Sequence, residues 1–434
     1  MPDALNILLN PVGSAGDVHP LIGIGGALKA RGHKVTVLVN AYFKPLVEKM
    51  GLGYVEQGTL EQFETILHHP DAWHPRKALG VIFGNMVRAI VPMCVEQLKA
   101  LVTPGNTVIC GSSLAMGTRV AQDLLGTPTV TVHLAPSLFR SMYKAPKMGG
   151  VWMPDGMPHF LKAAFWWFAD WAVVDPAICP PLNEYRRTLG LAPVKRPMNG
   201  WWNSPSCVLA MFPKWFAEPQ PDWPSQVHQL SFPRFDEREL HEPDSELETF
   251  LAAGDKPLVF TPGSAMLQGE KFFAAAADAC RRLNRRGILL TRFKEQLPTD
   301  LPPNVRHFDY VPLSYVLPRA AAMVYHGGIG TCSQALAAGI AHLIMPMAHD
   351  QHDNAARVEK MGVGASLEPK HFTGALLAAR LESLLTNRDL PGRAWEIARK
   401  FEQEKPIEEA CELIEQAARG EGLAAASPLK ADRD

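Results

Sequence analysis

The stretch Tyr325–Ala355, YHGGIGTCSQALAAGIAHLIMPMAHDQHDNA, decides the fold of this chain. The apolar run before it, residues 320–324, predicts a buried strand that ends at a group of glycines. Residues 332–338 predict a helix, so a strand, a glycine turn and a helix follow one another. This arrangement directs backbone N–H groups and the positive end of the helix dipole at one point. Residues 341–347 then predict a second apolar strand.

Polar side chains accompany both turns of this stretch. Glycines let a diphosphate approach the backbone, and neighbouring side chains add hydrogen-bond donors. After the second strand, Asp350 and Gln351 place an acid and an amide side by side, which suits the adjacent hydroxyls of a sugar. A strand–turn–helix unit without a ligand is the alternative, but it does not explain this pair. The candidate diphosphate ligands are His326, Gly328, Gly330 and Thr331.

Length and composition indicate a globular protein with more than one domain. At 434 residues the chain exceeds a single hydrophobic core, which predicts two or three domains. Charged residues make up 20% and the formal net charge is -1. The composition therefore gives no sign of a basic surface for binding nucleic acid or anionic lipid. Seven scattered cysteines without a C-x-x-C pair, and an N-terminus without a signal-peptide pattern, predict reduced thiols in the cytoplasm and no zinc site.

The first half of the chain alternates short strands with helices. Residues 5–12 predict a strand that ends at Gly13, and a helix follows with Pro20 near its start and Gly32 past its end. The alternation is typical of a parallel sheet covered by crossover helices. No G-x-G-x-x-G follows the first strand, so the dinucleotide-binding fingerprint is absent. The further predicted strands are 34–40, 54–55, 107–110, 127–134 and 207–212.

A second alternation begins at Pro257, after a stretch rich in proline, tryptophan and acidic residues. We therefore expect an α/β protein with two Rossmann-like domains, residues 1–214 and 257–402, joined by a linker at 215–256. Residues 403–419 predict a helix that returns to the first domain, and residues 420–434 have the composition of a flexible tail.

The most aromatic segment of the chain is FLKAAFWWFADWAVV, residues 160–174. It is too short to span a bilayer, and Lys162 and Asp170 interrupt it. One interpretation is an apolar wall for an acceptor, with Phe165, Trp167 and Trp171 as candidate acceptor-binding residues. A face that touches a membrane surface is the second interpretation, and a buried amphipathic helix is the third.

The two turns of the opening stretch match H-x-G-x-x-[ST] … D-Q-x-x-N-A, and so resemble the donor-binding signature of family 1 glycosyltransferases. The sequence GSAGDVHPLIGIG, residues 13–25, is similar to the GSRGDVQP opening of sterol and glycopeptide-antibiotic glycosyltransferases. The likeness is closer still to the rhamnosyltransferases of rhamnolipid biosynthesis, through WFA at 215–217 and DWP at 222–224. The resemblance covers nearly the whole chain and implies the GT-B fold, two Rossmann-like parallel-sheet domains facing a cleft.

The resemblance also implies roles in donor binding. Tyr310 and Val311, followed by proline, match the step whose aromatic residue stacks on the nucleotide base and whose middle residue offers backbone groups. Ser264 matches a further phosphate contact. Gln334 stands where plant members carry a glutamate that holds both ribose hydroxyls. Because a carboxylate is the better acceptor for two hydroxyls and deoxyribose lacks one, Gln334 favours a thymidine donor.

The resemblance places the general base at Asp17, three residues before Pro20, where plant members carry histidine. The aspartate that would orient such a histidine is replaced by Ser112. The two changes are consistent, because an aspartate base needs no partner to fix a tautomer. His19 is the rival base, and an N-cap of the first helix is the structural alternative for Asp17.

The implied activity is inverting, metal-independent transfer of a sugar to the hydroxyl of a lipid-like acceptor such as a hydroxyalkanoyloxyalkanoate. In the branch that the chain resembles, the donor is dTDP-rhamnose. We expect no cofactor and no divalent cation, because the D-x-D match, Asp432–Asp434, lies in the tail. A UDP-glucose-dependent sterol or polyketide glycosyltransferase and a non-catalytic sugar-nucleotide sensor are the alternatives. Peripheral membrane contact and the oligomeric state stay open.

Overall fold

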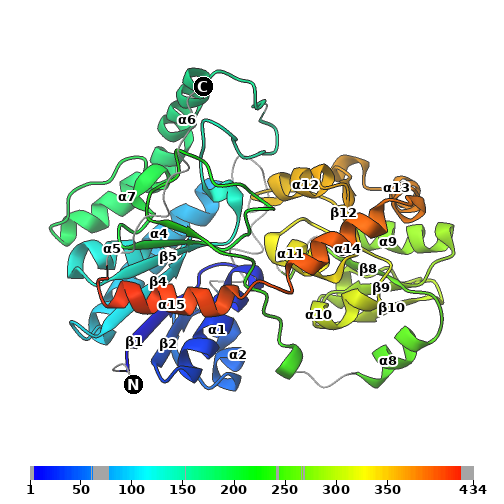
Figure 1. Ribbon diagram of the computed structural model, residues 1–434, viewed down its shortest axis with the longest axis horizontal. Coiled ribbons are helices and arrows are strands. Elements are labelled where there is room, and N and C mark those ends of the chain that lie inside the picture. Colours follow the sequence, from blue (N-terminus) through cyan, green and yellow to red (C-terminus); the bar gives the residue numbers. More distant parts are fainter. Residues whose placement is uncertain are drawn as a thin grey trace. The chain divides into compact units, whose positions relative to one another are not determined.

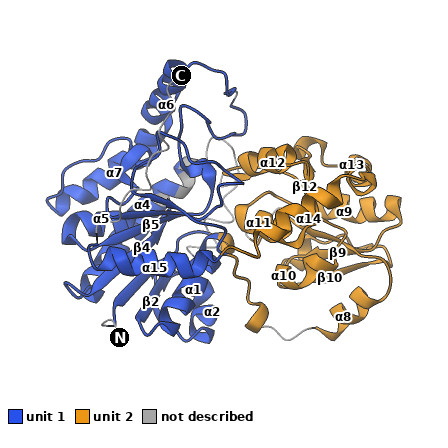
Figure 2. Cartoon of the chain, viewed as in Figure 1, with its two compact units in different colours: residues 1–13, 17–233, 405–434 blue, residues 14–16, 234–404 orange. Residues whose placement is uncertain are grey.

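The computed structural model describes residues 4–59, 61, 78–151, 153–240, 244–264, 266 and 269–421. The chain divides into two compact units, shown in different colours in Figure 2. Unit 1 comprises residues 1–13, 17–233 and 405–434, and unit 2 comprises residues 14–16 and 234–404. Each unit holds one parallel sheet with helices packed on it (Figure 1), which confirms the expected pair of α/β domains.

The sheet of unit 1 has the strand order β3-β2-β1-β4-β5-β6-β7, with every pair parallel. Its central strands are buried along their whole length because helices cover both faces, so they read as continuous apolar runs. The strands are β1 (Asn6–Asn10), β2 (Lys34–Val39), β3 (Gly53–Glu56), β4 (Thr107–Ser112), β5 (Thr129–His133), β6 (Cys207–Ala210) and β7 (Val227–Gln229).

The helices of this half follow the predicted alternation, with two differences. The first helix begins at Ala15, so Pro20 lies inside it and not at its start. The aromatic helix continues through a π-helical turn, η3 (Asp170–Val174), into a further helix that the sequence analysis did not predict. The helices are α1 (Ala15–Ala30), α2 (Lys44–Lys49), α4 (Ala78–Leu101), α5 (Met116–Leu125), α6 (His159–Ala169) and α7 (Asp175–Thr188).

The last described helix, α15 (Pro406–Ala418), belongs to unit 1 and packs on β4, β5 and β6. Its Glu415 accepts hydrogen bonds from Arg31 Nε at 2.6 Å and Nη2 at 2.8 Å, and lies 2.9 Å from His33 Nε2. These bonds, that of Arg31 first, lower the pKa of Glu415 to about 2. A charged pair therefore ties the end of the chain to the loop before β2. Most of the expected tail, residues 422–434, lies outside the described residues.

The sheet of unit 2 has the order β10-β9-β8-β11-β12-β13, again all parallel. Its strands are β8 (Leu258–Thr261), β9 (Gly287–Leu290), β10 (Val305–Phe308), β11 (Ala322–Tyr325), β12 (Ala341–Ile344) and β13 (Gly364–Ser366). Its helices are α8 (Ser245–Ala252), α9 (Glu270–Leu283), α10 (Leu313–Val316), α11 (Ile329–Ala338), α12 (Gln351–Lys360), α13 (Gly374–Thr386) and α14 (Leu390–Lys400).

Residues 215–256, expected to link the domains, contain regular structure: β7 joins the first sheet and α8 lies in unit 2. The change of unit falls between Pro233 and Arg234. All seven cysteines are free thiols, and six of them are buried. None of the described helices has the length and apolar character needed to cross a bilayer.

Candidate functional site

The predicted donor-binding residues gather at the carboxyl edge of the second sheet. Strand order reverses between β8 and β11, with β9 and β10 on one side and β12 and β13 on the other. In parallel α/β sheets, ligands bind outside the carboxyl ends of the strands at such a switch point. Tyr325, the last residue of β11, pairs with Thr261 at the end of β8 and with Ile344 at the end of β12. Three loops therefore leave the sheet at one place.

The glycine turn after β11 needs glycine for two reasons. Gly327 has a φ of +98°, and a Cβ there would lie 2.7 Å from Ile344 Cγ2 and 3.2 Å from the carbonyl oxygen of Gln351. Gly328 then occupies the N-cap of α11 and brings no side chain to cap the helix. Gly330 and Thr331, both half-buried, lie in the first turn, whose N–H groups have no partner within the helix. The turn thus offers backbone donors and a positive helix end to an anion.

His326 joins this turn to the one after β8. Gly263 has a φ of +104°, and a Cβ there would lie 2.9 Å from Cε1 and 3.1 Å from Nδ1 of the imidazole. The imidazole thus covers a turn 63 residues earlier in the chain. Burial lowers the pKa of His326 to about 4, so the ring is neutral at pH 7. Its Nδ1 is buried without a hydrogen-bond partner among the described residues, a condition that a ligand atom would satisfy.

Asp350 connects the end of the β12 loop to the start of α11. Its Oδ2 accepts hydrogen bonds from Ile329 N at 3.2 Å and from Asn354 Nδ2 at 2.7 Å. Asn354 is fully buried, and its Nδ2 also donates to the carbonyl oxygen of Gly327 at 2.9 Å. The acid, the amide and the glycine turn therefore form one hydrogen-bonded unit.

The side chain of Gln351 also forms hydrogen bonds to the loop after β12, which the sequence did not suggest. It is 3% exposed, and its Oε1 accepts hydrogen bonds from Met347 N at 2.8 Å and Ala348 N at 3.2 Å. The side-chain oxygen therefore holds the loop after β12 in place, and only the side-chain N–H₂ could still donate to a ligand. Sequence analysis also missed α12, which begins at Gln351, because Gln351, Asp353 and Asn354 are polar residues on its buried face.

The remaining donor candidates lie near the same edge. Tyr310 follows β10 and is 37% exposed, while Val311 beside it is buried. Burial raises the pKa of Tyr310, so its hydroxyl stays protonated. Ser264 is exposed in the turn after β8, and Gln334 is 8% exposed on α11.

In unit 1, Asp17 and His19 both lie in the first half of α1 and are half-buried. The helix begins at Ala15, so Asp17 is its third residue and not its N-cap. A Cβ at Gly13 would lie 2.8 Å from the Cβ of Asp17, so the side chain turns back over the glycine turn. The ring of His19 lies 6.3 Å from that of Phe43, edge to face.

A hydrogen-bonded chain at the ends of β4 and β5 was not predicted. Ser113 Oγ lies 2.8 Å from His133 Nδ1, and His133 Nε2 lies 2.8 Å from Asn203 Oδ1. His133 is fully buried, and burial lowers its pKa to about 4, so it is neutral. The amide oxygen fixes the proton on Nε2, and Ser113 therefore donates to Nδ1. No local motif could have revealed residues 20 and 70 positions apart.

The neighbouring Ser112 accepts a hydrogen bond from Val12 N at 2.9 Å and so holds the loop after β1 in place.

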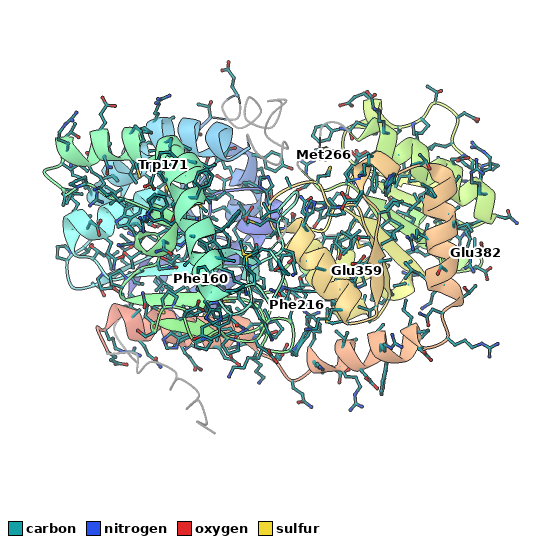
Figure 3. The ribbon with its side chains drawn as sticks, turned by 90° about the horizontal axis from the view of Figure 1, so that it is seen from above. Phe160, Trp171, Phe216, Met266, Glu359 and Glu382 are labelled. Atoms are coloured by element: carbon teal, nitrogen blue, oxygen red, sulfur yellow. The ribbon has the colours of Figure 1, made fainter. Side chains whose placement is uncertain are left out.

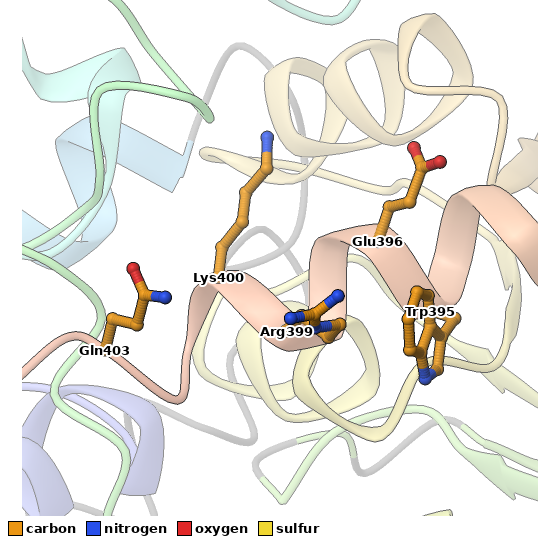
Figure 4. Close-up of a pocket in the computed structure, with 5 residues that line it drawn as sticks. All are labelled: Trp395, Glu396, Arg399, Lys400 and Gln403. Carbon is orange, nitrogen blue, oxygen red and sulfur yellow. The ribbon is translucent and has the colours of Figure 1, made fainter.

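The three acceptor candidates do not lie on one surface. Phe165 is half-buried and packs with Trp166 in an apolar cluster. Trp167 and Trp171 are 50% and 61% exposed and stack on each other with parallel rings 6.3 Å apart. Separately, a shallow pocket of about 240 Å³ on α14 (Figure 4) contains none of the predicted residues. It is lined by Trp395, Glu396, Arg399, Lys400 and Gln403.

Comparison with known proteins finds glycosyltransferases among the relatives of this chain. Residues 287–416 match the family model of the erythromycin biosynthesis protein CIII-like C-terminal domain. The chain is 28% identical over 426 residues to O-mycaminosyltylonolide 6-deoxyallosyltransferase of Streptomyces fradiae, covering 95% of this chain and 97% of the relative. It is 26% identical over 423 residues, 93% of its length, to sterol 3-beta-glucosyltransferase of Pichia angusta, and spans 33% of that longer protein.

Solved structures share the fold over nearly the whole chain. The glycosyltransferase of kitacinnamycin has a TM-score of 0.71 at 21% identity and covers 96% of this chain and 100% of its own. The spinosyn rhamnosyltransferase complexed with thymidine diphosphate has a TM-score of 0.67 at 17% identity, covering 95% and 100%. The two parallel sheets and the named relatives agree. The chain is a glycosyltransferase of the GT-B fold.

Proposed function

We propose that the protein transfers rhamnose from dTDP-rhamnose to the hydroxyl of a lipid-like acceptor such as a hydroxyalkanoyloxyalkanoate, with inversion at the anomeric carbon. One observation carries the donor part: the N-terminus of α11, two glycine turns and the buried Nδ1 of His326, which has no partner among the described residues, converge at one sheet edge. Fixed N–H donors of this kind stabilise the charge of a leaving diphosphate without a metal.

The thymidine base is supported by Gln334. Its amide, on the buried side of α11, is a weaker acceptor for two ribose hydroxyls than a carboxylate would be. Deoxyribose lacks one of those hydroxyls, so an amide in place of a carboxylate weakens the binding of a thymidine donor less than that of a uridine donor. A spinosyn rhamnosyltransferase solved with thymidine diphosphate is among the structures of similar fold, which is consistent with this choice.

The lipid-like acceptor is supported by the cluster beneath α6. Phe165 and Trp166 pack there with methionines, whose unbranched side chains adapt to irregular apolar ligands. Burial of an acyl chain contributes roughly 25 cal/mol per Å², so a long tail would dominate the affinity for the acceptor. The methionines are Met142, Met148, Met153 and Met157.

The reaction is a direct displacement. The acceptor oxygen forms a bond to the anomeric carbon while the bond from that carbon to the diphosphate oxygen breaks, and the nucleoside diphosphate leaves with the electron pair. The proton of the acceptor hydroxyl passes to the carboxylate of Asp17 in the first turn of α1. His19, two residues along the same helix, is the rival base.

A second candidate keeps the reaction and changes both substrates: UDP-glucose as donor and a sterol or polyketide as acceptor. The names of two relatives favour the acceptor part of this candidate, since one is an O-mycaminosyltylonolide 6-deoxyallosyltransferase and the other a sterol 3-beta-glucosyltransferase.

A substrate matrix separates the two. Each of dTDP-rhamnose and UDP-glucose is mixed with a hydroxyalkanoyloxyalkanoate length series, a sterol and a tylonolide, and released nucleoside diphosphate is measured. We expect turnover with dTDP-rhamnose and the lipid series, and a KM that falls as the acyl chains lengthen. Phe165→Ala should flatten that dependence. Turnover confined to UDP-glucose with the sterol or macrolide would establish the second candidate instead.

The base preference is tested with free nucleotides. Calorimetry should give tighter binding of thymidine diphosphate than of uridine diphosphate, and Gln334→Glu should shift the ratio toward uridine. Gln416→Glu, the same change at a half-buried position of α15, is the matched control and should leave the ratio unchanged. Equal affinities for both nucleotides in the wild type would contradict the inference from Gln334.

A further inference from the structure

The helical segment α6–η3, residues 159–174, is inverted relative to an ordinary surface helix. Its two charged side chains point inward: Lys162 is fully buried and its Nζ donates to two backbone carbonyl oxygens, at 2.8 and 3.1 Å. Asp170 is 2% exposed and pairs with Arg140 at 2.6 Å. The outward side chains, named here the α6 face, are apolar and 45% to 71% exposed: Phe160, Leu161, Trp167, Phe168, Trp171 and Val173. Figure 3 labels Phe160 and Trp171.

Both charged side chains of the segment take part in this inversion. A surface helix normally turns its charges to water and its apolar stripe to the core. Here the buried charges are satisfied by specific partners, so the segment is held in this orientation at the cost of exposing aromatic rings. A medium less polar than water is therefore the environment that suits the α6 face.

The size of the α6 face favours a shallow surface contact. At about 200 Å² for a fully exposed aromatic side chain, the six residues present roughly 600 Å² of apolar surface. This is at the upper end of the largest patch on a typical monomer, roughly 300–600 Å². It is less than the roughly 800 Å² that each partner buries in a stable protein complex. A second copy of the chain is thus a poorer fit than a lipid surface.

Positive charge lies beside the face. The guanidinium of Arg196 is 5.9 Å from the ring of Trp167, and its backbone N donates to Asp175 Oδ1 at 2.9 Å, which holds the loop against the segment. Lys195 precedes it, and both side chains are exposed. Neither forms an ion pair with a described residue. Although the whole chain is nearly neutral, this edge therefore offers two cations to anionic headgroups.

We propose that the α6 face docks the protein on the surface of an anionic bilayer. Tryptophan rings have an apolar body and a polar N–H, and prefer the depth of the lipid headgroups. The stacked pair Trp167 and Trp171 would lie at that depth, and Arg196 and Lys195 would meet lipid phosphates. The inference does not rest on the proposed function, because docking needs neither donor nor acceptor.

Flotation of the full-length protein with vesicles tests the proposal. Vesicles of phosphatidylglycerol and phosphatidylcholine in equal parts should carry the wild type, and the triple variant W167S/F168S/W171S should lower the partition coefficient at least ten-fold. Trp395→Ser is the matched control, since Trp395 is 58% exposed on α14 (Figure 4) and should not affect binding. Thermal melts verify that the variants fold.

The charge part of the proposal has its own test. K195A/R196A should weaken binding to the anionic vesicles by roughly five-fold for each cation, the equivalent of about 1 kcal/mol, and leave binding to pure phosphatidylcholine unchanged. Three results would overturn the proposal. The first is a wild type that fails to float with the vesicles, and the second is a triple variant that floats to the same extent as the wild type. The third result is a dimer of the wild type in sedimentation velocity that the triple variant no longer forms. The last would show that the α6 face joins two copies of the chain.

Discussion

His326→Ala should weaken binding of thymidine diphosphate by about 10–100-fold. The imidazole Nδ1 is buried, lacks a partner among the described residues, and lies 3.1 Å from the position of a Cβ on Gly263. A hydrogen bond from a neutral donor to a charged phosphate contributes about 1.5–3 kcal/mol, and each 1.4 kcal/mol changes the affinity ten-fold. Isothermal calorimetry at pH 7.5 measures this directly, and His326→Gln, which keeps a side-chain N–H, should lose less.

A matched control separates ligand binding from packing. His228, on β7 of unit 1, also has a buried nitrogen without a partner among the described residues, and burial lowers its pKa. His228→Ala should leave the affinity for thymidine diphosphate unchanged. If His326→Ala lowers the melting temperature of the free protein and spares the affinity, the residue is structural and the reasoning is refuted.

The pH dependence gives a second check on the same residue. In the free protein, burial holds the pKa of His326 near 4, below its ordinary 6.5. A bound diphosphate would raise that pKa, because the negative charge stabilises the imidazolium. Binding then takes up a proton, so the affinity should increase as the pH falls from about 6.5 toward 4. The affinity of the wild type should therefore rise more steeply with falling pH than the affinity of His326→Ala. Parallel pH profiles for the two proteins would contradict a contact between His326 and the diphosphate.

Three further predictions concern the base and the stability of the fold. Asp17→Asn should lower turnover by about 10²–10⁴-fold and leave the affinity for the donor unchanged; a larger loss in His19→Ala would move the base to His19. His133 and His342 are fully buried with pKa values of about 4 and about 3, so the unfolded chain alone takes up protons below pH 6.5. The free energy of unfolding should fall by about 1 kcal/mol per pH unit for each histidine between pH 6.5 and 5, measured by urea denaturation. Glu415→Gln should lower the free energy of unfolding by about 1–3 kcal/mol at pH 7 and by little at pH 2. The lowered pKa of Glu415 stabilises the fold above pH 4.5, and this contribution is lost as the pH falls from 4.5 to 2. Equal losses of stability at pH 7 and pH 2 would contradict this.

The sequence by itself determined the architecture of both sheets in outline. Strands buried on both faces are continuous apolar runs, and the glycines between them mark the turns, so the predicted strands 34–40 and 107–110 lie close to the bounds of β2 and β4. Gly327 follows in part from the same local logic, because glycine adopts a positive φ without the strain that a side chain would bring. Periodicity and backbone sterics act within a few residues and can be read from them.

The tertiary structure alone decided which of these residues meet. Strand order brings Gly263 under His326, and it links Ser113, His133 and Asn203 across 90 residues. The same holds for the orientation of α6, whose apolar pattern is compatible with a buried helix. Its charges turn inward because Arg140 and two carbonyl oxygens of the preceding loop receive them, and the tryptophans are left outside. These partners lie 7, 19 and 30 residues before the charges that they bind, outside the helix itself, so the periodicity of the helix does not encode them.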